Sequence, residues 1–357
     1  MKKIIVVVSL LFLSILSSMG QTSSTGSSYI STAVPFLTIS PDSRASGMGD
    51  VGAATSADIN SIHWNASKSV FAKAKSGVSL SYTPWLKEIA SGMSLGYFSA
   101  YHKIDNIQAV SGSFRYFNLG KIEYITNSND PTRTVNPSEL AIDLAYSRKL
   151  AENFSMGVAF RYIRSSIIED KTASSIAADV SCFYTKALEK GNIAFGANIS
   201  NIGSKITYSD DSYFIPTNLK VGTTYTKNIS TDIKLALSLD LNKLLVDAGD
   251  MSSTQSQKGV IMLGNKSNKD VLSSMITSMS QFSSITYSFG TECSFQDMLT
   301  LRLGYFYENK DAGDRNYLTT GLGVIYKDIA FDLAYLISTN ANNPLRNTLR
   351  FTIGYNF

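Results

Sequence analysis

The sequence predicts an outer-membrane β-barrel, and three observations favour this fold class. From Gly77 to the C-terminus, apolar residues alternate with small or polar ones. Charged residues make up 17% of the chain, whereas about 25% is usual in soluble domains. After residue 20, no apolar run approaches the roughly 20 residues that a membrane-spanning helix needs. Strands with alternating faces and no helical spans are typical of a transmembrane barrel.

Residues 1–20 are predicted to be a cleaved signal peptide. They begin with Lys2 and Lys3, continue with an apolar run and end in small residues up to Gly20. The residue after the cleavage point is Gln21 and not cysteine, so we expect no lipid anchor. The formal charge of +4 falls to about +2 once the two lysines are removed, which argues against a nucleic-acid partner.

Residues 76–357 are predicted to form the barrel. In residues 233–241, Ile and Leu alternate with Lys234, Ala236 and Asp240. The polar face is small and sparse, as expected for a lumen, whereas a soluble sandwich carries Lys and Glu on its outer face. A single-chain bacterial barrel has an even number of strands. Fourteen are predicted, at 77–83, 92–101, 106–118, 138–148, 154–165, 174–186, 192–201, 216–227, 232–243, 284–293, 299–308, 316–326, 329–338 and 347–357.

The predicted connections alternate between tight and long ones. The tight connections are 102–105, 149–153, 187–191, 228–231, 294–298 and 327–328. The longer connections are 84–91, 119–137, 166–173, 202–215, 244–283, 309–315 and 339–346. Because barrels have short periplasmic turns and longer extracellular loops, we expect both mature termini in the periplasm.

The last predicted strand has apolar residues on one face and an aromatic final residue. These residues are Phe351, Ile353, Tyr355 and Phe357. The pattern resembles the C-terminal signal by which the outer-membrane assembly machinery recognises its clients. An ordinary last strand that happens to end in Phe is the alternative, and the leader and the alternation favour the signal.

The longest loop, 244–283, contains one predicted helix. Six apolar residues fall on a single helical stripe: Val271, Leu272, Met275, Ile276, Met279 and Phe282. Two interpretations are open for this stripe. The loop folds over the barrel mouth and packs on its aromatic residues, or the helix docks a partner protein.

Residues suited to catalysis or metal binding are scarce. The only histidines are His63 and His102, and HExxH and phosphate-loop motifs are absent from the sequence. We therefore predict no enzyme activity, no metal and no cofactor, and a structural hydrogen-bonding role for His63. Cys182 and Cys293 are not expected to pair, because two cysteines are too few for a disulfide framework.

Several charged residues of both signs are predicted to face the lumen. They are Asp143, Arg161, Asp179, Lys220, Lys234, Asp240, Arg302, Asp332 and Arg350. We interpret them as bracing and solvating the lumen, with a substrate path as the alternative.

The segment 34–67, VPFLTISPDSRASGMGDVGAATSADINSIHWNAS, has no clear helical or strand period. Its glycines allow the backbone to pass close to a wall or to adopt positive φ, which favours an ordered plug over a linker. The residues expected to matter are Asp42, Arg44, Gly47, Met48, Gly49, Asp50, Gly52, His63, Trp64 and Asn65.

This segment closely resembles the N-terminal signature of the PorV (LptO) family, outer-membrane components of the type IX secretion system. Its wider pattern is similar to the hatch of FadL-type transport barrels, which implies a FadL-like barrel with a hatch within residues 21–75. One departure is Asn65-Ala66-Ser67, where the family has Asn-Pro-Ala, so the turn lacks the fixed φ of proline. Asn65 can still form an Asx-type turn. We also expect Asp42, Arg44 and Asp50 to pair and fasten the segment.

The resemblance implies a protein-handling role. PorV-like proteins bind the C-terminal signal domain of cargo that leaves a large translocon barrel of the Sov or SprA type. They pass the cargo to a PorU-type sortase complex at the cell surface. The implied partners are therefore that translocon, the sortase, cargo signal domains and outer-membrane lipid. Two alternatives remain open: a FadL-like channel for hydrophobic small molecules, and lipid A deacylation, which needs a Ser–His pair with an orienting third group.

Overall fold

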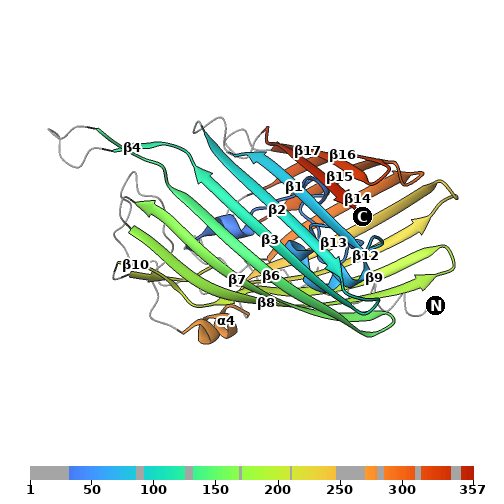
Figure 1. The fold of residues 1–357 in the computed structure, drawn as a ribbon, viewed down its shortest axis with the longest axis horizontal. Helices are drawn as coiled ribbons and strands as arrows, with labels where there is room; N and C mark the ends of the chain where they lie inside the picture. The colour runs from blue at the N-terminus through green and yellow to red at the C-terminus, as the bar shows by residue number, and fades with distance from the viewer. Residues whose placement is uncertain are drawn as a thin grey trace.

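Fourteen antiparallel strands close into one barrel in the computed structural model (Figure 1). The structure describes residues 32–85, 92–124, 132–168, 171–209, 211–246, 270–279, 285–309, 315–338 and 347–357. The predicted signal peptide, most of the 244–283 loop and Phe282 lie outside these residues.

The predicted strands are all present, and their order around the ring follows the chain. The barrel strands are β1 (Ser76–Pro84), β2 (Met93–Lys103), β3 (Gln108–Leu119), β6 (Ser138–Ala151), β7 (Phe154–Ile168), β8 (Lys171–Leu188), β9 (Gly191–Gly203), β12 (Asn218–Asn228), β13 (Ile233–Leu244), β14 (Ile285–Phe295), β15 (Leu299–Tyr307), β16 (Tyr317–Tyr326), β17 (Ile329–Ser338) and β18 (Leu349–Asn356). The ring closes where β1 pairs with β18, with Gly77 opposite Asn356.

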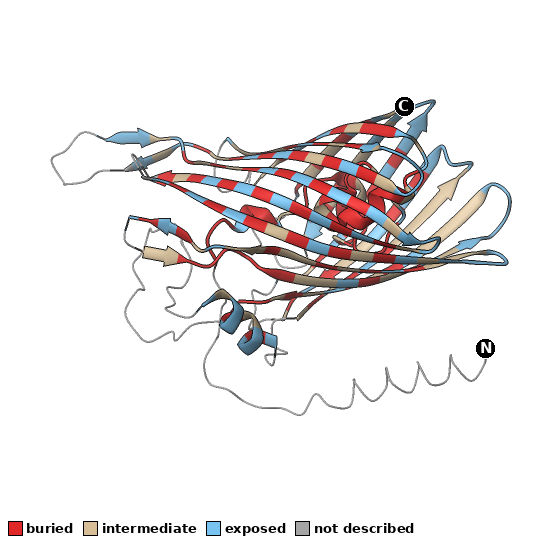
Figure 2. Ribbon diagram, turned by 60° about the horizontal axis from the view of Figure 1, so that its bottom comes forward, coloured by how far each residue is buried: buried red, intermediate tan, exposed pale blue. Residues whose placement is uncertain are grey.

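Each strand presents its apolar residues outward and its small or polar residues inward. In β6, Ile142 and Leu144 are exposed, whereas Asp143 between them and Ala145 after them are buried. Figure 2 shows this alternation as bands along the strands. An outward apolar face is the arrangement that a lipid environment requires of a barrel.

The two ends of the barrel differ. At one end neighbouring strands are joined by short turns, as at 189–190 and 327–328. The other end carries two hairpins, β4 (Ile122–Tyr124) with β5 (Arg133–Val135) and β10 (Ile206–Tyr208) with β11 (Asp211–Tyr213). The helix α4 (Val271–Met279) also lies there, outside the barrel wall (Figure 1).

One predicted long loop is wrong. Residues 166–173 are mostly strand, because β7 and β8 continue to Ile168 and from Lys171, so only 169–170 separate them. Serines and threonines at the ends of these strands hid their continuation, since such residues suit a loop as well as a strand. None of the described helices is long and apolar enough to cross a membrane.

Candidate functional site

The described part of the N-terminal segment, residues 32–75, lies inside the barrel, and we call it the hatch (Figure 1). It contains four short helices: η1 (Pro35–Thr38), α2 (Ser43–Ser46), α3 (Ser61–Trp64) and η2 (Ala66–Phe71). Helices of four to six residues are not stable alone. Side-chain caps and contacts with the barrel wall therefore hold them.

Asp42 connects two of these helices. Its carboxylate accepts a hydrogen bond from the Ala45 amide at 2.9 Å, which caps α2. The Trp64 indole N–H at the end of α3 donates to the other carboxylate oxygen at 2.7 Å. Both oxygens of a buried carboxylate are thus satisfied, and the two helices are held side by side.

The hatch glycines lie where backbone meets backbone. A Cβ on Gly47 would come within 2.9 Å of the Gly321 Cα on β16. Gly49 has φ of 69°, a left-handed conformation that favours glycine, and its amide donates to the Thr319 hydroxyl at 2.8 Å. A side chain at Gly52 would overlap the Trp64 ring. Gly47 and Gly49 thus allow the hatch to lie directly against the wall, and Gly52 leaves room for the Trp64 ring.

A chain of buried charges joins the hatch to the wall. Arg44 donates to both carboxylate oxygens of Glu292 on β14, at 2.9 and 3.0 Å, and to Asp58 at 2.8 Å. Arg302 on β15 bonds Glu292 at 2.8 Å and Asp332 at 2.6 Å. Arg44 and Glu292 are 14% and 13% exposed, so water screens the pair little.

The expected pairing among Asp42, Arg44 and Asp50 is wrong. Both Asp42 oxygens already accept hydrogen bonds from Ala45 and Trp64, and Arg44 points to the wall instead. Asp50 also reaches the wall, where the Tyr317 hydroxyl donates to it at 2.6 Å and Arg350 lies 3.5 Å away. Arg44 and Asp50 therefore fasten the hatch to the barrel, whereas Asp42 holds two helices of the hatch together.

Two further wall contacts hold the middle of the hatch. One carboxylate oxygen of Asp240 on β13 accepts hydrogen bonds from the amides of Gly52 and Ala53, at 2.7 and 2.9 Å. The Asn65 side-chain amide donates to the carbonyls of Ala53 and Cys182, each at 2.9 Å. The Asn65 oxygen accepts from the Ser67 amide at 3.1 Å, so the turn without proline is an Asx-type turn.

Neither histidine has the surroundings of a catalytic base. Nδ1 of His63 is hydrogen-bonded to the Arg115 guanidinium, and burial together with that positive charge lowers the pKa of His63 well below its ordinary value. Nδ1 of His102 is hydrogen-bonded to the Ser76 hydroxyl at 2.7 Å. In the described part of the chain, no carboxylate hydrogen-bonds to either ring, and no cluster of residues could hold a metal ion.

Other inward charges brace the wall. Arg161 on β7 pairs with Asp143 on β6 and with Asp179 on β8, and it also bonds Asn201 on β9. Each of these four side chains is buried. One arginine thus links four neighbouring strands from inside the lumen. Both cysteines are free thiols.

Apolar side chains fill the lumen toward the long-loop end. The hairpin β10–β11 turns inward, and its buried residues pack with η1 and the wall. This cluster includes Val34, Phe36, Leu95, Phe117, Ile163, Ile206, Tyr208, Tyr213 and Ile215. The hairpin therefore packs against the η1 end of the hatch.

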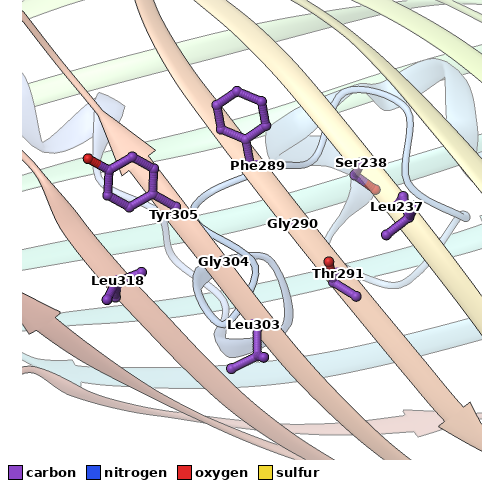
Figure 3. A pocket seen from close by; sticks show the side chains of 9 residues that line it. All are labelled: Leu237, Ser238, Phe289, Gly290, Thr291, Leu303, Gly304, Tyr305 and Leu318. Carbon is purple, nitrogen blue, oxygen red and sulfur yellow. The ribbon is translucent and has the colours of Figure 1, made fainter.

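The outer wall carries a shallow groove of about 360 Å³ over β13 to β16. Figure 3 shows its side chains, including Phe289, Leu303 and Tyr305, with the hatch lying behind the strands. On the inner side, a Cβ on Gly290 or Gly304 would strike Met48 of the hatch. The groove therefore does not lead into the lumen.

This closed fourteen-stranded barrel with a plug of short helices has the fold of FadL-like outer-membrane barrels. The fold is similar to the Pseudomonas putida toluene transporter TodX, with a TM-score of 0.56 at 11% identity, over 88% of this chain and 98% of that chain. It is also similar to the Ralstonia pickettii toluene transporter TbuX (TM-score 0.51, 10% identity, 88% and 97%). A Pseudomonas aeruginosa FadL homologue matches with a TM-score of 0.51 at 10% identity, over 92% and 100%. At these identities the likeness concerns the fold alone.

The particular family follows from the sequence. The model of the type IX secretion system protein PorV matches residues 22–251, and the chain belongs to this family. A comparison with curated proteins returns no match.

Proposed function

We propose that this chain is a non-enzymatic cargo-handling factor of the type IX secretion system. It binds the C-terminal signal domain of proteins that emerge from the large translocon barrel and passes them to the sortase complex at the cell surface. No cofactor takes part. The family membership supports the secretion role. We place the binding surface outside the cell because α4 lies at the end of the barrel that carries the long loops, and such loops are extracellular.

The observation that carries this proposal is the exposed apolar face of α4. Leu272 and Ile276 are 69% and 73% exposed, whereas Ser274 and Ser278 on the opposite face are buried. A helix that packed for stability alone would bury its leucine and isoleucine and expose its serines. The apolar face is thus available to a partner, in agreement with the docking interpretation of the stripe.

Substitution of the exposed face tests the proposal. In a variant with Leu272→Ser, Ile276→Ser and Met279→Ser, we expect co-purification of cargo signal domains to fall at least tenfold, because apolar anchors dominate binding energy. A matched variant with Ser273→Ala and Thr277→Ala changes the exposed polar side of α4 and is expected to bind normally. Both variants should remain heat-modifiable on gels. Undiminished cargo binding by the serine variant would remove α4 from the binding surface.

A channel for hydrophobic small molecules is the second candidate function. The apolar cluster at the long-loop end of the lumen favours it, as does the fold shared with toluene transporters. The packed hatch and the paired charges beside it oppose it. Toluene uptake into vesicles that contain the purified barrel separates the two: uptake no faster than in empty vesicles supports the cargo-handling role, and faster uptake supports the channel.

A further inference from the structure

The short-turn end of the barrel carries lysines that lack ion-pair partners. Lys186 lies near the end of β8, Lys190 in the following turn and Lys227 near the end of β12, and all three are exposed. At the same end Lys234 pairs with Asp297 at 2.6 Å. In the described part of the chain, no ion pair forms at Lys186, Lys190 or Lys227.

The strand register brings these lysines to one place on the outer wall. Lys186, Ile193 and Tyr225 are opposite one another across β8, β9 and β12. One step nearer the turn, Gly191 lies between Leu188 and Lys227. Two strand spacings across the sheet and two residues along the strands separate Lys186 from Lys227, so their backbones are about 12 Å apart.

Gly191 packs closely against β12 between the two strand lysines, because a Cβ there would lie 1.9 Å from the Thr226 carbonyl oxygen. It has no side chain in the row that contains Lys227. Its φ of 143° lies in the region that side chains rarely adopt, so the position is suited to glycine. The Asn228 amide donates to the Lys190 carbonyl at 3.0 Å, which fixes the turn beside β12. The carboxylate of this turn, Glu189, is exposed.

Neighbouring aromatic residues place this group at the edge of the lipid layer. Tyr184 and Phe195 lie one row deeper than Lys186 and face outward, with ring centroids 6.5 Å apart. Outward aromatic residues mark the interface between hydrocarbon and headgroups in barrels. Lysines just beyond such a girdle extend their ammonium groups to headgroup level. Figure 2 shows the exposed turn ends of the strands in this part of the barrel.

We propose that Lys186, Lys190 and Lys227 form a binding site for the phosphate of an anionic phospholipid in the leaflet at the short-turn end. The lysines hold the phosphodiester over the outer face of the wall at Gly191, which carries no side chain. The acyl chains run along Tyr184 and Phe195. A net negative headgroup is preferred, because the site offers three ammonium groups, which outnumber the exposed carboxylates of the two adjoining turns, Glu152 and Glu189.

Native mass spectrometry of the purified barrel tests this site with added phosphatidylglycerol, phosphatidylethanolamine or inorganic phosphate. The wild type is expected to retain phosphatidylglycerol in preference to phosphatidylethanolamine. Each lysine contributes about fivefold to the affinity, so Lys186→Ala with Lys227→Ala should weaken it more than tenfold. Arginine at both positions should preserve binding. Lys327→Ala, at the same end on another turn, is the matched control and should bind as the wild type does.

Three results would overturn the proposal. They are unchanged phosphatidylglycerol binding by the double alanine variant, equal retention of the two lipids, and displacement of the lipid by inorganic phosphate at the lipid's own concentration. The last result would identify a simple anion site. Heat-modifiable migration shows that each variant is folded, so a loss of binding reports on the site.

Discussion

Replacement of Arg44 by methionine is the sharpest test of how the hatch is held. The change keeps the length of the side chain and removes five hydrogen bonds: two to Glu292, one to Asp58 and two to Ser56. Loss of one partner from a buried ion pair costs about 3–5 kcal/mol. Glu292 keeps its bond to Arg302, and Asp58 is 23% exposed, so the lower limit of about 3 kcal/mol applies.

Hydrogen exchange measures this loss. The amides of Gly47, Gly52 and Ala53 are hydrogen-bonded to Ser43 or Asp240 and exchange only when the hatch opens. A loss of about 3 kcal/mol raises the opening constant, and with it the exchange rate of these amides, roughly a hundredfold. Amides of the barrel strands should remain protected.

A matched variant separates the buried pair from charge removal in general. Arg315→Met also removes an ion pair, with Glu308 at 2.7 Å, but the Arg315 side chain is 48% exposed. Such pairs contribute at most about 1 kcal/mol, so hatch exchange should not change. If exchange in the Arg44→Met hatch rises less than threefold while the barrel stays folded, the ion pair does not hold the hatch.

Three further perturbations address the packing, assembly and chemistry of the barrel. Gly52→Ala should displace the Trp64 ring and destabilise the hatch by about 1–3 kcal/mol, which a shift in tryptophan emission would report. The control Gly112→Ala should leave the emission unchanged, because a Cβ there meets nothing closer than 3.7 Å. Phe357→Ala should reduce the fraction of protein inserted into the membrane. The melting temperature of the inserted barrel should change little, because Phe357 is 60% exposed. Normal insertion would refute the role of this residue in assembly. His102→Ala should leave lipid A acylation and secretion unchanged, and altered acylation would point to chemistry at the His102–Ser76 pair.

The barrel strands could be predicted because lipid enforces the alternation. In β13, Leu237 and Leu241 face outward and are exposed, while Ser238 and Asp240 are buried in the lumen. A lipid-facing residue has no alternative to being apolar, so each strand repeats the same period. The hairpins β10–β11 and β4–β5 were missed, since strands of three residues are too short to show a period.

The partners of the hatch could not be predicted to the same degree. Alternation alone places Glu292 inward, between Gly290 and Ser294, and this signal was available in the sequence. That Glu292 meets Arg44, 248 residues earlier, depends on which strand faces α2. Local sequence does not contain this information, because a side chain inside a closed ring can meet residues from any strand.

The position of the hatch partners has a consequence for assembly. Arg44, Asp50 and Ser43 reach residues of β14 to β18, including Glu292, Tyr317 and Thr352. These strands are made last, so the part of the hatch around α2 cannot be fastened until the C-terminal strands are in place. A barrel that is slow to close should therefore carry an open hatch. Among newly inserted Phe357→Ala barrels, we expect the hatch to remain cleavable by protease for longer than in the wild type. Equal protection at all times would show that the hatch folds independently of the last strands.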